Sequence, residues 1–206
     1  MFLKKRSIPN ILTIFRIALV PIIIVLILVK SSNIYSFTIN AQTYYFSLNY
    51  VIAGSFFVVA CLTDFLDGYL ARHNKWVSDF GKLWDPIADK ILINSILICF
   101  AVQHLTLVWI PIVMIGRDII VDALRMYAVS QKRTIAANIF GKLKTVFQMI
   151  GILIIFFVFN ASNKDINCCL VNYYWLQNMF MYLALITSVV SGVIYFVKYS
   201  QSKQHK

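Results

Sequence analysis

Two stretches of the chain, eight residues apart, decide how it is interpreted: Asp64-Phe-Leu-Asp67-Gly68-Tyr-Leu-Ala71-Arg72 and Gly81-Lys-Leu-Trp-Asp85-Pro-Ile-Ala-Asp89. At about 100° per residue, the numbered positions of the first stretch lie within about 140° on one face of a helix. In the second stretch Gly81, Asp85 and Asp89 recur every four residues and form a stripe on the next helix. The loop between them is short, so the two helices should run antiparallel. Four carboxylates are therefore expected to converge.

The sequence around these stretches is strongly apolar. Of the 206 residues, 60% are hydrophobic and 13% are charged, about half the charged fraction of ordinary soluble domains. Apolar runs longer than about 18 residues recur along the chain. These features exclude a soluble globule and predict one all-α, polytopic membrane domain over residues 1–206. Its six transmembrane helices are expected roughly at 8–30, 50–72, 81–102, 105–129, 139–160 and 174–198.

The distribution of charge predicts the orientation of these spans. Nineteen Lys and Arg residues against eight acidic residues give a formal charge of +11. The basic residues gather at the N-terminus, at 72–82, at 132–144 and in the C-terminal tail, which marks those ends as cytoplasmic. We therefore expect a multi-pass protein of the cell membrane with both termini in the cytoplasm. Such charge favours anionic lipid headgroups or an anionic substrate over nucleic acid.

The aspartates are the candidate functional residues, because an ionised carboxylate inside a membrane helix costs about 2.5–3.5 kcal/mol. Convergent carboxylates repel one another unless a hard cation such as Mg²⁺ or Mn²⁺ lies between them. Small residues on the same faces, Gly68, Ala71 and Gly81, leave room for a ligand, and the planar cation of Arg72 suits phosphate. The stretch thus predicts a metal-bridged pyrophosphate site. The structural alternative is a helix N-cap at Asp85, topology-setting cations and glycines for helix packing, but it leaves the other aspartates unexplained.

The pattern D-x2-D-G-x2-A-R-x8-G-x3-D-x3-D, met at every fixed position, resembles the signature of the CDP-alcohol phosphatidyltransferases. That resemblance implies six transmembrane helices, a homodimer, and transfer of a substituted phosphate from a CDP-linked donor to an alcohol with release of CMP. It also implies a divalent metal pair held by four ligands: Asp64, Asp67, Asp85 and Asp89. Asp89 would in addition be the catalytic general base. The CDP portion of the donor would lie at Gly68, Arg72 and Ser78.

A second group of charges indicates the acceptor. The segment 105–129 carries Arg117, Asp118, Asp122 and Arg125, and the next span opens with Gly141-Lys142-Leu-Lys144-Thr145. These cations are predicted at the same depth as the aspartates, which favours a phosphorylated acceptor. Alternatively, the aspartates pair internally with the two arginines, and the lysines reach toward headgroups.

Further elements, including Ile8-Pro9-Asn10-x-Leu12-Thr13-x-x-Arg16 and Gly141-Lys-x-Lys-Thr145, resemble a bacterial branch of the same family. Its members join CDP-diacylglycerol to sn-glycerol 3-phosphate, giving phosphatidylglycerophosphate and CMP. The resemblance implies that Asn10 and Thr13 touch the nucleotide. Four cations would then bind the acceptor phosphate: Arg117, Arg125, Lys142 and Lys144.

Two alternatives remain open. One is a sibling enzyme such as a cardiolipin synthase, which Arg125 and the short linker before residue 139 disfavour. The other is a divalent-cation transporter, which would leave Gly68, Arg72 and Gly81 unexplained. The four cysteines have no metal-ligand spacing and are interpreted as packing residues.

Overall fold

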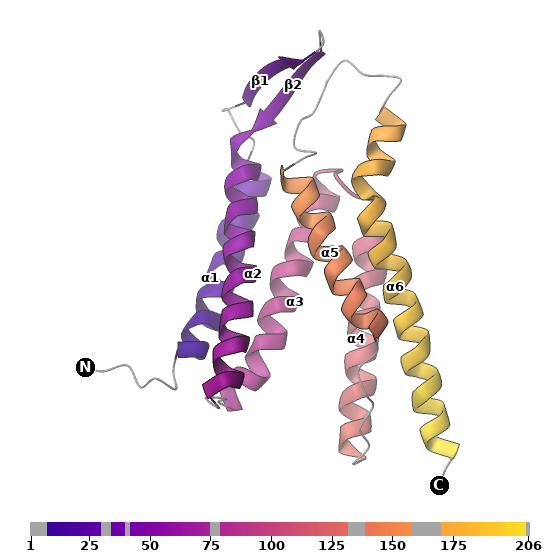
Figure 1. The fold of residues 1–206 in the computed structure, drawn as a ribbon. Helices are drawn as coiled ribbons and strands as arrows, with labels where there is room; N and C mark the ends of the chain where they lie inside the picture. Colours follow the sequence, from indigo (N-terminus) through magenta and orange to yellow (C-terminus); the bar gives the residue numbers. More distant parts are fainter. Residues whose placement is uncertain are drawn as a thin grey trace, which may run out of the picture. The chain divides into compact units, whose positions relative to one another are not determined.

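The computed structural model of the protein describes residues 8–29, 34–39, 42–74, 79–131, 139–157 and 170–204. Over these residues the chain forms six helices and one pair of strands (Figure 1). The helices are α1 (Ile8–Leu28), α2 (Leu48–Asn74), α3 (Asp79–Val102), α4 (Trp109–Ser130), α5 (Ile139–Phe157) and α6 (Leu170–Gln204). The predicted helical architecture is confirmed, since each expected span contains one helix and the bounds differ by a few residues.

An antiparallel hairpin occupies much of the segment 31–49, which lies between the first two predicted spans and in which no strand was predicted. Strand β1 (Ile34–Ile39) pairs with β2 (Gln42–Ser47), with Tyr35 opposite Phe46 and Phe37 opposite Tyr44. Aromatic and β-branched residues dominate both strands, and such residues favour cross-strand pairing. The prediction of helices alone therefore missed this pair of strands.

Two compact units make up the chain. The first contains α1, the hairpin, α2, α3 and the last two residues of α5, Phe156 and Phe157; the second contains α4, the rest of α5 and α6. In the first unit α1 packs against both α2 and α3. Its buried stripe repeats every three or four residues, at Thr13, Arg16, Val20, Ile23 and Ile27. Two polar residues thus occupy positions that a core-facing stripe normally fills with apolar ones.

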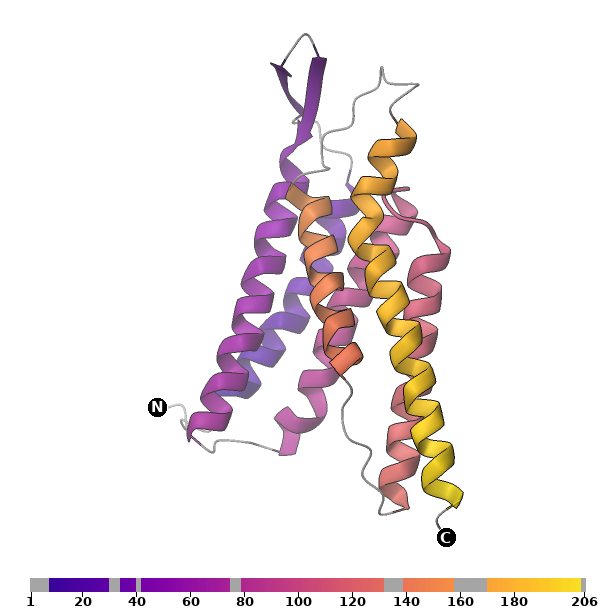
Figure 2. The same ribbon diagram turned by 45° about the vertical axis from the view of Figure 1, so that its right-hand side comes forward.

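In the second unit α4 packs against α6, as Figure 2 shows. Close approach between α5 and α6 depends on Gly151, where an added Cβ would lie 3.1 Å from the methyl carbon of Met181. The buried faces here are also polar: Lys144 and Gln148 on α5 and Ser188 and Ser191 on α6. This unit therefore buries hydrogen-bonding groups that need partners inside the protein.

Four helices in the described part of the chain are long and apolar enough to cross a membrane. The qualifying segments are Ile11–Leu28, Leu48–Phe65, Ile139–Phe157 and Trp175–Val197. Charges interrupt the other two helices: α3 carries Asp85, Asp89 and Lys90, and α4 carries charges from Arg117 to Arg125. The protein is an integral membrane protein with several candidate spans.

Candidate active site

The aspartate motif is tied to α1 through a buried arginine. Nη1 of Arg16 lies 2.8 Å from Oδ1 of Asp64 on α2. The Arg16 side chain is 0% exposed, whereas the Asp64 side chain is 42% exposed. A guanidinium buried in an apolar helix needs an anion, and a carboxylate at hydrogen-bond distance supplies it. The pair therefore fixes where Asp64 lies on α2 while part of its carboxylate stays accessible.

A second contact ties the next aspartate to the same face of α1. The hydroxyl of Thr13 donates a hydrogen bond to Oδ1 of Asp85 on α3. Thr13 and Arg16 are three residues apart and so are neighbours on the helix surface. Two adjacent side chains of α1 therefore hold one carboxylate from α2 and one from α3.

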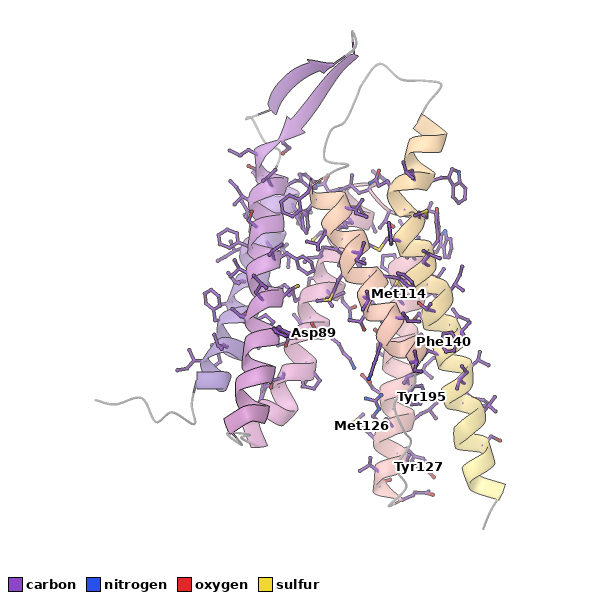
Figure 3. All side chains as sticks on the ribbon, in the orientation of Figure 1. Asp89, Met114, Met126, Tyr127, Phe140 and Tyr195 are labelled. Atoms are coloured by element: carbon purple, nitrogen blue, oxygen red, sulfur yellow. The ribbon has the colours of Figure 1, made fainter. Side chains whose placement is uncertain are left out.

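Asp89 lies one helical turn after Asp85 on α3 and is labelled in Figure 3. The Cys61 thiol on α2 lies within electrostatic range of Asp64, Asp89 and Arg16. Adjacent side chains of α1 thus contact Asp64 and Asp85, while the convergence of the four carboxylates stays a prediction.

Other residues predicted at this site are placed only in part. Asn10 lies on α1, Asp67, Gly68, Ala71 and Arg72 lie on α2, and Gly81 lies on α3, but the surroundings of their side chains fall outside the described structure. Ser78 lies outside the described residues. Among the side chains that the structure does describe, no three His, Cys, Asp or Glu residues form a group that could hold a metal ion. The roles of these residues therefore remain predictions.

The charges predicted to bind the acceptor form a network in the second unit. Asp118 on α4 accepts from Arg117 Nη1 through Oδ1 at 3.0 Å and from Lys144 Nζ on α5 through Oδ2 at 2.5 Å. Lys144 is buried, 6% exposed. One carboxylate therefore holds two of the four predicted acceptor-binding cations close together.

The other two cations have different surroundings. Nη2 of Arg125 donates to the Tyr195 hydroxyl on α6 at 2.9 Å, and Figure 3 labels Tyr195 there. Lys142 is exposed near the start of α5. The alternative interpretation is correct in that Arg117 pairs with an aspartate, Asp118. It is wrong in that Lys144 does not reach toward headgroups but is buried against the same aspartate.

Sequence reasoning missed two features of these sites. It assigned no role to Arg16, although a lone cation in an apolar span is a sufficient signal to look for an anionic partner. It also assigned nothing to α6, where Ser188 and Ser191 contact Arg117. No local pattern marks those serines, because small polar residues are common at helix interfaces in membranes.

Comparison with known proteins decides the family. The family model for CDP-alcohol phosphatidyltransferase matches residues 6–190. The chain belongs to the CDP-alcohol phosphatidyltransferase family. This match includes the aspartate motif and most of both units, so the predicted membership is confirmed.

Several relatives within the family are similar over nearly their whole length. A CDP-diacylglycerol–glycerol-3-phosphate 3-phosphatidyltransferase of Mycoplasma genitalium is 40% identical over 98% of this chain and 87% of its own. The enzyme of the same name from Mycoplasma pneumoniae is 41% identical over 93% of this chain and 86% of its own. That of Bacillus subtilis is 31% identical over 93% of this chain and 94% of its own.

Proposed function

We propose that this CDP-alcohol phosphatidyltransferase transfers the phosphatidyl group of CDP-diacylglycerol to sn-glycerol 3-phosphate, producing phosphatidylglycerophosphate and CMP. The attachment of Asp64 and Asp85 to neighbouring residues of α1 is the observation that supports the chemistry. The near-full-length relatives of that activity support the choice of acceptor.

The donor set fits a pair of hard divalent cations, Mg²⁺ or Mn²⁺, which prefer carboxylate oxygens. The contacts to α1 use one oxygen of each carboxylate, Oδ1 of Asp64 and Oδ1 of Asp85, and both carboxylates would help to hold the cations. We assign Asp67 and Asp89 as the remaining ligands. When bound, the metal pair would neutralise charge on the donor diphosphate.

Asp89 is proposed as the general base. Its carboxylate would take the proton from the attacking hydroxyl of glycerol 3-phosphate as that oxygen bonds to the phosphorus carrying the diacylglycerol. The bond from that phosphorus to the bridging oxygen then breaks, and CMP leaves with the electron pair. Donor binding is assigned to seven residues: Asn10, Thr13, Gly68, Ala71, Arg72, Ser78 and Gly81.

The phosphate of the acceptor is assigned to Arg117, Arg125, Lys142 and Lys144. The shared contact of Arg117 and Lys144 with Asp118 supports this assignment for those two. A guanidinium and an ammonium held together present several N–H donors to one phosphate. Arg125 and Lys142 are assigned by sequence position.

The proposal includes six membrane spans, cytoplasmic termini and a homodimer in the cell membrane. Helices α3 and α4 would cross the membrane despite their charges. Pairing inside the protein, as between Asp118 and Lys144, reduces the free-energy penalty of such charges. The family match across most of both units supports one functional domain over residues 1–206.

The decisive test supplies the purified protein with CDP-diacylglycerol and one acceptor at a time, and measures CMP release. Glycerol 3-phosphate is expected to drive release, whereas serine, inositol phosphate and phosphatidylglycerol are not. Release with phosphatidylglycerol alone would identify a cardiolipin synthase. Mn²⁺ uptake into proteoliposomes without any CMP release would identify a transporter.

A further inference from the structure

Helix α6 accepts two hydrogen bonds from Arg117, although no residue of α6 belongs to the aspartate motif or to the predicted acceptor site. Nε of Arg117 donates to the backbone carbonyl of Ser188 at 3.0 Å, and Nη2 donates to the hydroxyl of Ser191 at 2.7 Å. Both serines are 0% exposed. With the contact to Asp118, three nitrogens of the guanidinium each have a partner in the protein.

Two glycines allow this approach. A Cβ on Gly192 would lie 3.3 Å from Cγ of Arg117, which is closer than most such contacts, and 3.5 Å from Nε, which is an ordinary contact distance. A Cβ on Gly141 of α5 would lie 3.3 Å from the Ser191 hydroxyl oxygen. The α6 backbone at Gly192 therefore packs directly against the aliphatic part of the Arg117 side chain, and α5 packs at Gly141 against Ser191.

A guanidinium has five N–H donors, and the three contacts use one donor on each nitrogen. Among the described residues, one donor on Nη1 and one on Nη2 have no partner and would be open to a ligand. Fixing a long side chain in advance removes the rotamer entropy that binding would otherwise cost. The same Asp118 also holds Lys144, so a second cation is fixed beside the first.

We infer that α6 positions Arg117 for the acceptor phosphate, with Ser191 and Gly192 as positioning residues that set the affinity for a phosphorylated alcohol. This inference depends on the proposed function. Neither residue touches the substrate; both act through the arginine. The effect of changing them should therefore appear in the Michaelis constant for glycerol 3-phosphate, and not in the handling of the CDP-linked donor.

The test uses the full-length protein in proteoliposomes and measures initial rates of CMP release, varying each substrate at saturation of the other. Ser191→Ala is expected to raise the KM for glycerol 3-phosphate about tenfold, as loss of a hydrogen bond to a charged group predicts. The kcat and the KM for CDP-diacylglycerol should stay at wild-type values. Gly192→Ala should change the same constant in the same direction. Ser200→Ala, the same chemical change at an exposed position of α6, is the matched control and should change nothing.

A double variant tests whether Ser191 acts through the arginine. In an Arg117→Lys background, Ser191→Ala should add no further increase in KM, because the Nη2 donor is already absent. An unchanged KM for glycerol 3-phosphate in both Ser191→Ala and Gly192→Ala would overturn the inference alone, as would equal losses for both substrates. A wild-type protein that releases no CMP with glycerol 3-phosphate would overturn the proposed function and this inference with it.

Discussion

Replacing Thr13 by valine tests the link between α1 and the aspartate motif, because valine keeps the shape of the side chain and removes its hydroxyl. The hydroxyl donates to Oδ1 of Asp85, and Thr13 is 0% exposed, so water cannot take its place. A hydrogen bond to a charged group contributes about 1.5–3 kcal/mol. Since Asp85 is itself partly exposed, its carboxylate can recover some solvation, and the lower part of that range applies.

If the hydroxyl orients Asp85 for catalysis, about 1.5–2 kcal/mol of lost transition-state stabilisation lowers kcat by about 10- to 30-fold. The assay is CMP release at saturating glycerol 3-phosphate over a range of CDP-diacylglycerol concentrations. The KM for CDP-diacylglycerol should not change, whereas a direct contact between Thr13 and the nucleotide would raise it. A lower kcat with an unchanged KM would make Thr13 a positioning residue for Asp85, and would remove it from its assigned role in donor binding.

The matched control is Thr13→Ser, which keeps the hydroxyl and loses a methyl group. It should retain most of the activity of the wild-type protein. Wild-type kcat in Thr13→Val would refute the idea that α1 orients Asp85. Equal losses in both variants would instead show that position 13 tolerates no change of its side chain, and that the hydroxyl has no specific role.

Three further predictions concern the base, the metal and the packing. Asp89→Asn should keep binding of CDP-diacylglycerol, measured by titration, while kcat falls about 10²- to 10⁴-fold; near-normal turnover would remove Asp89 from the role of base. Chelation with EDTA should abolish CMP release, and added Mg²⁺ or Mn²⁺ should restore it; release that persists in EDTA contradicts the metal assignment. Gly54→Ala should have a Tm about 6 °C below that of Gly116→Ala. Overpacking costs about 1–3 kcal/mol, and each kcal/mol lowers the Tm by about 2–4 °C. The new Cβ at Gly54 would lie 2.9 Å from Phe156 Cβ, whereas at Gly116 it meets no described atom within 4 Å. Equal Tm values would contradict the packing of α2 against Phe156.

Local patterns predicted the helices and the motif because both repeat within a few residues. The apolar runs predicted six helices close to their observed bounds, and the break between the predicted spans 81–102 and 105–129 is confirmed by the turn before α4. The hairpin was missed because its strands are short and its polar residues resemble a linker. Secondary structure was predicted correctly where the apolar pattern extended over a whole membrane span.

Contacts between distant segments could not be predicted in the same way. Arg16 was visible as an unusual charge, but nothing nearby in sequence identified Asp64 as its partner. Lys144 was predicted to bind the acceptor phosphate or, in the alternative, to reach toward headgroups. Neither interpretation identified its partner Asp118, 26 residues earlier. A side chain's sequence neighbours do not reveal which helix it will meet.

The amino-acid sequence by itself determined the membrane class, the helical order and the aspartate spacing that identifies the family, since each depends on composition or on the period of one helix. Only the tertiary structure decided which polar and charged side chains are partners: Arg16 with Asp64, Thr13 with Asp85, and Arg117 with Asp118 and α6. The physical reason is that burial removes water as a partner, and the packing of separate helices then decides which group takes its place.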